Sequence, residues 1–174
     1  MRRATALFLL LLLLAACTRA ASDQSGSGVV AQNKPFPRLT GQTLQGGNFD
    51  TNSLLGQPFV LSVWATWCAP CAHEQPMLHR LQQKFGDSVG FLGIDYRDDS
   101  AAAKAWTKQF GITYPSLWDP SGRYAKDLGF PFLPDTYVVD PSGTIRYAFF
   151  GEPDENQLSS LISGLIPSAS ATPS

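Results

Sequence analysis

Two cysteines three residues apart, Cys68 and Cys71, stand where a short apolar segment gives way to a helical pattern. The apolar run Pro58–Trp64 is rich in β-branched and aromatic residues and predicts a buried strand, and the spacing that follows predicts a helix up to Phe85. The N-terminus of such a helix carries free N–H groups and about half a positive charge, which favour a thiolate on Cys68. Cys71 would lie beneath the first turn. The order strand, cysteine pair, helix therefore predicts a redox-active dithiol.

The same two cysteines also fit a structural disulfide or half of a zinc site. A zinc site needs further ligands, and the only histidines of the chain, His73 and His79, lack the usual separation from the cysteine pair. Pro70 has no N–H group, but a first-turn position has no intrahelical partner to lose. We therefore expect a redox pair that uses neither a metal nor another cofactor.

The remaining patterns predict one mixed α/β domain. The expected strands lie at 89–94, 136–139 and 144–150, and the expected helices at 100–110 and 154–166. Strands alternating with helices around a hairpin indicate a mixed sheet with helices on both faces.

The domain is expected to span residues 35–166. A flexible tether at 17–34 would precede it and a disordered tail at 167–174 would follow it. Because 13 basic residues face 14 acidic ones without a basic block, no nucleic-acid partner is expected.

The N-terminus carries the features of a targeting segment. A basic start precedes an apolar run at 6–16, which is shorter than the roughly 20 residues of a bilayer span and typical of a signal peptide occupying residues 1–16. The run ends Leu-Ala-Ala-Cys17, which resembles a bacterial lipobox. Cys17 is thus the expected lipidation site of a membrane-anchored, extracytoplasmic protein. Simple secretion after cleavage at Ala20 and an uncleaved anchor stay open.

Four segments resemble the thioredoxin-like TlpA, ResA and CcmG (DsbE) group of bacterial thiol–disulfide oxidoreductases. They are VLSVWATWCAPCAHEQP (60–76), GIDYRDD (93–99), GFPFLPDTY (129–137) and DPSGTIRY (140–147). The resemblance implies a thioredoxin fold, with a central mixed β-sheet flanked by helices. It also implies an N-terminal β-hairpin extension, here at Pro37–Leu39 and Gly47–Phe49.

The same resemblance assigns a substrate-binding loop. Pro134 matches a cis-proline that faces the cysteine pair, and the backbone of Leu133 would pair with a substrate chain. Asp135 matches an acidic residue that contacts partners, although an ordinary loop acid is also compatible with the sequence. Trp67, beside Cys68, is expected near the site.

Glu74 is the third candidate catalytic residue. The matching acid of ResA-like proteins modulates the proton transfers of the cysteine pair, whereas an exposed acid near a helix N-terminus is the alternative. Ser62 stands where thioredoxins carry a buried aspartate, so that proton relay is absent and Glu74 or water would serve Cys71.

These features predict thiol–disulfide exchange, in which Cys68 attacks and Cys71 resolves. The central dipeptide Ala69-Pro70 adds no donor or cation to stabilise the thiolate further, which favours a reductase over a disulfide-forming oxidase. A peroxidase would need a Pro-x-x-x-Thr-x-x-Cys pattern, which the sequence lacks, and an intact C-x-x-C argues against a non-catalytic binding module. The expected partners are protein thiols and disulfides, either apocytochrome c, as the resemblance suggests, or secreted proteins, with an upstream membrane thiol–disulfide donor.

Overall fold

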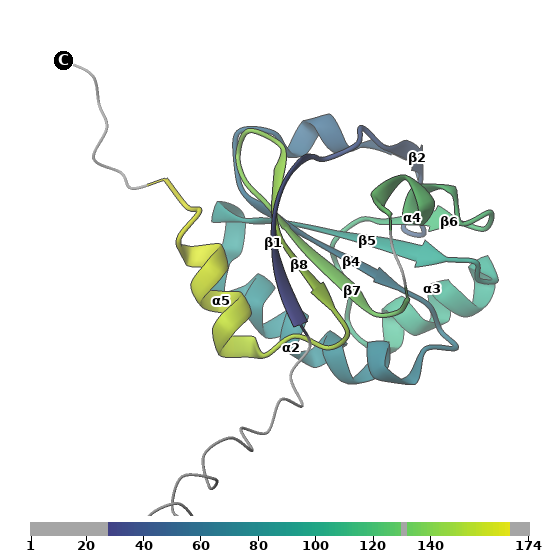
Figure 1. Cartoon of the computed structure of the whole chain (residues 1–174). Helices are drawn as coiled ribbons and strands as arrows, with labels where there is room; N and C mark the ends of the chain where they lie inside the picture. Colours follow the sequence, from purple (N-terminus) through teal and green to yellow (C-terminus); the bar gives the residue numbers. More distant parts are fainter. Residues whose placement is uncertain (1–27, 130–131, 168–174) are drawn as a thin grey trace, which may run out of the picture.

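The computed structural model describes residues 28–129 and 132–167 (Figure 1). Within these ranges, no helix is both long and apolar enough to cross a membrane. The strands are β1 (Gly28–Pro35), β2 (Thr40–Gln42), β3 (Asn48–Asp50), β4 (Phe59–Trp64), β5 (Gly90–Tyr96), β6 (Ser116–Asp119), β7 (Asp135–Val139) and β8 (Thr144–Phe150). The helices are η2 (Thr51–Leu54), α2 (Ala69–Phe85), η3 (Gly86–Ser88), α3 (Ser100–Gln109), α4 (Arg123–Leu128) and α5 (Glu155–Ser163).

Six strands form one mixed sheet in the order β1-β8-β7-β4-β5-β6. β4, β5 and β6 are parallel, whereas β7, β8 and β1 add to β4 in antiparallel fashion. One row of paired residues crosses the sheet from Val63 through Asp135 and Phe150 to Gly28. The last residues of β4, which lead to the cysteines, and the first residues of β1 therefore lie at the same end of the strands.

Alternation along β4 divides the core into two layers, because successive side chains of a strand point to opposite faces. Val60 and Trp64 belong to the apolar cluster formed with α2, α3 and α5. Phe59, Leu61 and Val63 belong to the cluster formed with η2 and α4 on the other face. The mixed sheet with helices on both faces is as predicted, and Ser62 shares the α2 side.

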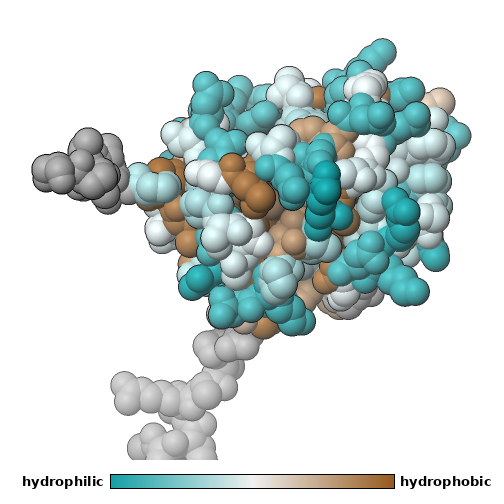
Figure 2. All heavy atoms as spheres, turned by 90° about the horizontal axis from the view of Figure 1, so that it is seen from above, coloured by the Kyte–Doolittle hydropathy of each residue, from teal (hydrophilic) through white to brown (hydrophobic). Residues whose placement is uncertain are grey.

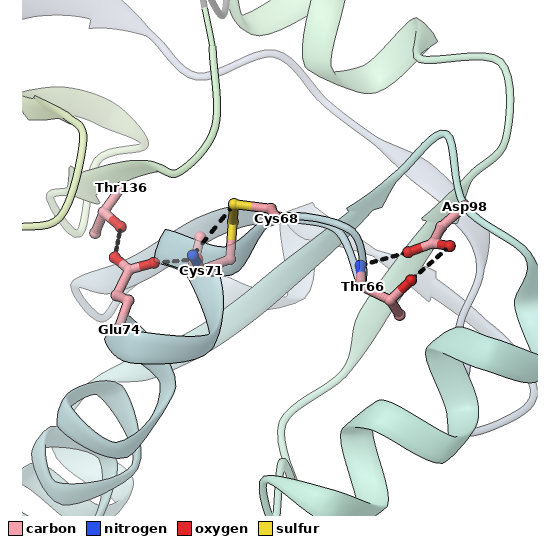
Figure 3. Close-up of a disulfide and its surroundings, with 7 residues drawn as sticks. Thr66, Cys68, Cys71, Glu74, Asp98 and Thr136 are labelled. Atoms are coloured by element: carbon pink, nitrogen blue, oxygen red, sulfur yellow. Dashed lines mark hydrogen bonds between the residues drawn. A yellow bond between two sulfur atoms is a disulfide. The ribbon is translucent and has the colours of Figure 1, made fainter.

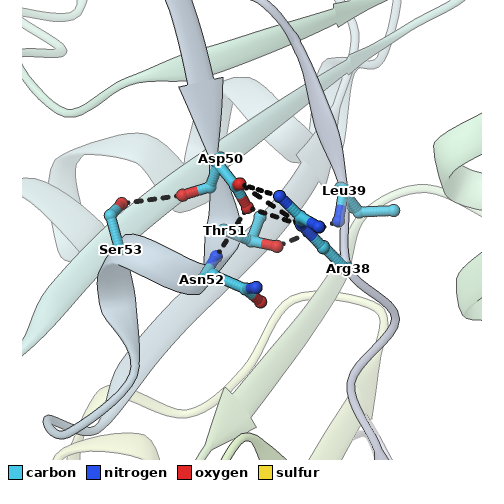
Figure 4. Close-up of polar contacts among 6 residues, drawn as sticks. All are labelled: Arg38, Leu39, Asp50, Thr51, Asn52 and Ser53. Carbon is cyan, nitrogen blue, oxygen red and sulfur yellow. Dashed lines mark hydrogen bonds and ion pairs between the residues drawn. The ribbon is translucent and has the colours of Figure 1, made fainter.

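The N-terminal extension is a separate two-stranded sheet of β2 and β3. It was expected at 37–39 and 47–49 and lies at 40–42 and 48–50. Asp50 ends β3 and caps η2 by accepting the Asn52 N–H at 3.0 Å, while its carboxylate also pairs with Arg38 at 2.6 Å (Figure 4). Thr51 Oγ1 accepts the Leu39 N–H at 2.9 Å, so the extension is fixed to the helical turn that follows it.

The prediction of a flexible tether is wrong from Gly28 onward, since residues 28–35 form β1 and pair with β8. This edge strand is held by backbone hydrogen bonds, and most of its side chains remain exposed, so it lacks the apolar alternation that identifies buried strands. β6 and α4 were also missed because they have only four and six residues. Residues 17–27 and 168–174 of the predicted tether and tail lie outside the described ranges.

Candidate active site

The two cysteines lie where β4 gives way to α2, as predicted. Cys68 is the N-cap residue of α2, and its Sγ accepts the Cys71 N–H at 3.1 Å (Figure 3). The two sulfur atoms are joined in a disulfide, with the Cα atoms 5.3 Å apart. In the reduced protein, the same N–H and the positive end of the helix dipole would stabilise a Cys68 thiolate.

The two sulfurs differ in access. Cys71 is fully buried, whereas Cys68 retains 5% exposure beside Trp67, whose side chain is 60% exposed. A partner disulfide can therefore approach Cys68 and not Cys71. Trp64 is instead part of the core, where it stacks on Trp106 with ring centroids 4.3 Å apart.

Glu74 lies one turn beyond Cys71 on α2 and is fully buried (Figure 3). The alternative of an exposed acid near the helix N-terminus is therefore wrong, because α2 packs this side of its first turns against the sheet. One carboxylate oxygen accepts a hydrogen bond from the Thr136 hydroxyl of β7, and the other accepts the Ser62 hydroxyl of β4 at 3.3 Å. Ser62 thus donates its hydroxyl directly to the buried acid Glu74.

Burial raises the pKa of Glu74 to about 7, because the charged form loses its hydration. The hydrogen bonds from Thr136 and Ser62 oppose this rise, and the negative charge of Glu152 adds to it. A buried carboxyl that titrates near neutral pH can both accept and return a proton at this position. Sequence reasoning did not identify Thr136 as its partner, since the contact joins helix α2 to strand β7, which is far from it in the chain.

The loop before β7 supplies the neighbouring surface. The Leu133–Pro134 peptide bond is cis, as expected. Leu133 is half-buried against the apolar cluster that contains Cys68 and Cys71, and Phe132 beside it is 55% exposed. Pro134 O accepts the Gly151 N–H at 2.9 Å, which ties this loop to the end of β8.

Asp135 is buried at the start of β7, so its side chain does not reach the surface as a partner contact requires. One oxygen accepts the Tyr137 hydroxyl at 3.3 Å, and the other has no hydrogen-bond partner. Burial raises its pKa to about 8. The expected surface role of Asp135 is therefore corrected: the residue opens β7, a central strand of the sheet whose five residues are all buried.

Another acid, Asp98, supports the cysteine loop from the other side. Asp98 accepts the Thr66 N–H at 2.5 Å and the Thr66 hydroxyl at 2.9 Å (Figure 3). Thr66 belongs to the turn that joins β4 to Cys68, so Asp98 fixes the approach to the helix. Helix α3 is capped by Asp99, whose carboxylate accepts the N–H groups of Ala101 and Ala102.

Asp95, opposite Trp64 in the sheet, is buried beneath this loop. Its pKa is raised to about 8, first by burial and then by the neighbouring carboxylate of Asp98. Sequence reasoning missed Asp95 as a site residue, although a single acid within the apolar strand 90–96 is a signal that could have revealed it.

Comparison with known proteins identifies the family. The model of the AhpC/TSA family matches residues 32–148, which include both cysteines, Glu74 and the cis-proline loop. The chain belongs to the AhpC/TSA family.

Among relatives in this family, the thiol:disulfide interchange protein DsbE of Pseudomonas fluorescens biotype C is 38% identical over 124 residues, which are 70% of this chain and 68% of the relative. A DsbF homologue from Corynebacterium diphtheriae superposes with a TM-score of 0.73 at 27% identity, covering 84% of this chain and 98% of that structure. A secreted Mycobacterium tuberculosis disulfide oxidoreductase homologous to Escherichia coli DsbE gives a TM-score of 0.67 at 28% identity, covering 73% and 96%.

This AhpC/TSA family member is a thiol–disulfide oxidoreductase of thioredoxin fold. The relatives are named for thiol–disulfide interchange, and the chain places a C-x-x-C disulfide at the helix N-terminus, where such exchange takes place.

Proposed function

We propose that this protein reduces disulfides of partner proteins outside the cytoplasm. The observation that carries the proposal is the N-cap position of Cys68, whose sulfur accepts one backbone N–H, together with the buried acid Glu74 behind the pair. A helix N-terminus lowers a thiol pKa modestly, and Ala69 and Pro70 add no cation. A nearby carboxylate opposes the thiolate. Because no cation is present and the carboxylate opposes the negative charge, the Cys68 thiolate is only weakly stabilised. The disulfide form of this protein is therefore favoured relative to the dithiol, which is the property of a reductant.

The reaction proceeds in two exchanges. The Cys68 thiolate attacks one sulfur of the partner disulfide and releases the other as a thiolate, which takes up a proton. Cys71 then loses its proton to Glu74 and attacks Cys68 Sγ, which releases the second partner sulfur as a thiolate. This thiolate takes up a proton from solvent, and Glu74 returns its own proton to solvent, so the protons balance. Two electrons and two protons pass to the partner, and Cys68–Cys71 is left as the disulfide that the structure holds. A thiol donor must then restore the dithiol.

The partner chain is proposed to lie between Trp67 and the Leu133–Pro134 loop. Trp67 and Phe132 offer exposed aromatic surface, and Leu133 is half-buried beside the cysteine cluster, where its backbone can pair with an extended chain. Aromatic side chains provide large contact area on protein-binding surfaces.

The reduction potential of the pair tests the direction. Equilibration with glutathione buffers, followed by Trp fluorescence, should give a value nearer the about −270 mV of thioredoxin than the about −120 mV of DsbA. These limits differ by about 7 kcal/mol, so the two outcomes are well separated. A value near the DsbA limit would make this protein an oxidase of secreted proteins and overturn the proposal.

The proposed substrates are the haem-site cysteines of apocytochrome c, and the proposed electron source is a membrane thiol–disulfide donor. Support comes from the resemblance of the cis-proline and 93–99 segments to CcmG and from the DsbE names of the relatives. A Cys71→Ser variant expressed in the native host should trap these cysteines on Cys68. Recovery of secreted proteins unrelated to cytochromes, in their place, would contradict this assignment.

We further propose that residues 1–16 are a signal peptide and that Cys17 carries the lipid anchor, on the Leu-Ala-Ala-Cys pattern. Both lie outside the described residues. The mature protein should partition into detergent, and Cys17→Ser should abolish this. An intact mass without lipid on the wild-type protein would refute the anchor.

A further inference from the structure

An open pocket of about 720 Å³ lies where β5 and β6 end and α4 begins. Seen from above, the side of the molecule that carries α4 (right in Figure 2) displays mostly hydrophilic and intermediate residues. The pocket is lined by Tyr96, Arg97, Ser121, Gly122, Arg123, Lys126 and Gly129. Three of these residues are cations and none is an acid, so the pocket is electropositive.

The three cations are exposed, and among the described residues none of them forms an ion pair with an acid. Arg97 lies over the ring of Tyr96 at 5.3 Å, and Arg123 lies over the ring of Tyr124 at 4.8 Å. Stacking on a ring limits the freedom of a guanidinium without neutralising its charge. The two arginines are therefore held in place. Arg97 also donates its Nε–H to Ser121 O at 3.5 Å, and the remaining N–H groups of both guanidinium groups can meet an incoming anion.

Asp127, next to Lys126 in the chain, is exposed and does not line the pocket. Two further acids close to these cations in the chain, Asp119 and Asp98, are turned toward the surrounding loops. Asp119 accepts the N–H groups of Arg123 and Ala125 at 2.8 and 3.1 Å, and it is buried beneath the loop. Asp98 is engaged by Thr66. Their carboxylates support the loops around the pocket, and neither one lines it.

The loop at Gly122 packs closely against Tyr96 and Arg97, which line the pocket on its other side. Gly122 adopts a φ of 74°, and a Cβ there would lie 2.7 Å from the Tyr96 ring and 2.9 Å from Arg97 Nε. Only glycine accommodates both the backbone conformation and this approach. A side chain larger than glycine at position 122 would therefore displace Tyr96 and Arg97 and change the shape of the pocket.

Arg97 connects the pocket to the cysteine pair. It is the non-glycine residue with positive φ (49°) among those described, a conformation that is uncommon and worth explaining. Its carbonyl accepts the Trp67 indole N–H at 3.4 Å, while its side chain lines the pocket. The Trp67 and Tyr96 ring centroids are 6.4 Å apart. The basic pocket therefore adjoins the exposed tryptophan that precedes Cys68.

We propose that this pocket binds an acidic side chain that the substrate polypeptide carries a few residues from its reactive cysteine. The proposal rests on the proposed function, because it assigns the substrate class of that site. Arg97, Arg123 and Lys126 would bind the carboxylate, and Trp67 would contact the chain between it and the disulfide. Arginine forks match carboxylates in bidentate geometry, which gives selectivity as well as attraction.

The test uses two peptide disulfides that differ only in a glutamate or a glutamine near one cysteine. The wild-type protein should reduce the glutamate peptide with a kcat/KM about 5–10-fold higher, the size expected of one well-placed charged contact at a partly exposed site. The double variant Arg123→Gln/Lys126→Gln should bring this ratio close to one. The matched control Lys104→Gln/Lys108→Gln removes two exposed charges from α3 and should keep the ratio.

A salt titration of the wild-type protein tests the same contact without any variant that could misfold. The preference for the glutamate peptide should shrink as salt screens the contact. Equal rates for the two peptides in wild-type protein, or the same loss in the α3 control, would overturn the proposal. If neither peptide is reduced, the proposed function fails. Calorimetric binding of the glutamate peptide, made with serine in place of both cysteines, then still decides the pocket: tighter binding than the glutamine peptide supports it, and equal binding refutes it.

Discussion

Replacement of Glu74 by glutamine keeps the shape of the side chain and removes its ability to exchange a proton. The glutamine oxygen can accept one of the hydroxyl groups of Ser62 and Thr136, and its NH2 group can donate to the oxygen of the other, so the fold should persist. General-base assistance is typically worth about 10²–10⁴-fold. Because Glu74 is fully buried, water cannot readily take its place, and a pKa of about 7 suits proton acceptance near neutral pH. We expect Glu74→Gln to slow resolution by Cys71 about 100–1,000-fold, an order-of-magnitude expectation from the same range. The attack of Cys68 should change much less.

The pH dependence gives a second readout. Glu74 accepts a proton only when ionised, so the wild-type resolution rate should rise as the pH passes about 7, and this rise should vanish in Glu74→Gln. The same raised pKa affects stability with a definite sign. Folding favours the protonated form, so Glu74 by itself makes the wild-type protein lose about 3 kcal/mol of stability as the pH rises from about 4.5 through about 7. The fall in stability over this range should be smaller in the glutamine variant by this amount.

Stopped-flow fluorescence of Trp64 and Trp67, with a peptide disulfide as substrate, separates the two exchanges. Glu155→Gln is the matched control, because it makes the same chemical change at an exposed acid of α5. A resolution rate of Glu74→Gln equal to that of the wild-type protein at every pH from 5 to 9, together with the altered stability profile, would show that Glu74 is structural. This result would refute the proton-transfer role.

Three further outcomes are expected. Iodoacetamide should label Cys68 quickly and the buried Cys71 slowly in the reduced protein, as mass spectrometry can show; faster labelling of Cys71 would reverse their roles. Thr136→Val removes a hydrogen bond that lowers the Glu74 pKa, so the resolution profile should move about 1–2 pH units upward, and a downward movement would contradict this reasoning. Asp95 has a pKa raised to about 8, so urea unfolding should show wild-type stability falling as the pH rises from about 4 to about 8, and Asp95→Asn should make this fall smaller, because Glu74 and Asp135 contribute to it as well.

The sequence predicts the sheet centre well because it is buried. The strand that the structure places at 59–64 and the helix at 69–85 agree closely with their expected bounds, since long apolar patterns follow directly from burial on one or both faces. The cis peptide bond at Pro134 was expected from family resemblance, as no local pattern distinguishes it from a trans bond.

What escaped prediction depends on tertiary contacts. β1 is stabilised by pairing with β8 and not by apolar side chains, so its composition resembles a linker. The burial of Glu74 follows from the packing of α2 on β4 and β7, and the inward direction of Asp135 follows from where β7 begins. A sequence reports the charge of these acids, whereas their solvation is decided by elements distant in the chain.

The row of paired residues Val63–Asp135–Phe150–Gly28 limits how far the cysteine pair can lie from a membrane anchor. Gly28, the first residue of β1, lies at the end of the sheet where β4 leads into the cysteine pair. If Cys17 is lipidated as proposed, residues 18–27 allow at most about 35–40 Å between the bilayer and that edge. A long tether would let the domain meet disulfides at many distances from the bilayer. This short segment instead keeps Cys68 close to the lipid surface. Partners would then be chains emerging from the membrane or held beside it.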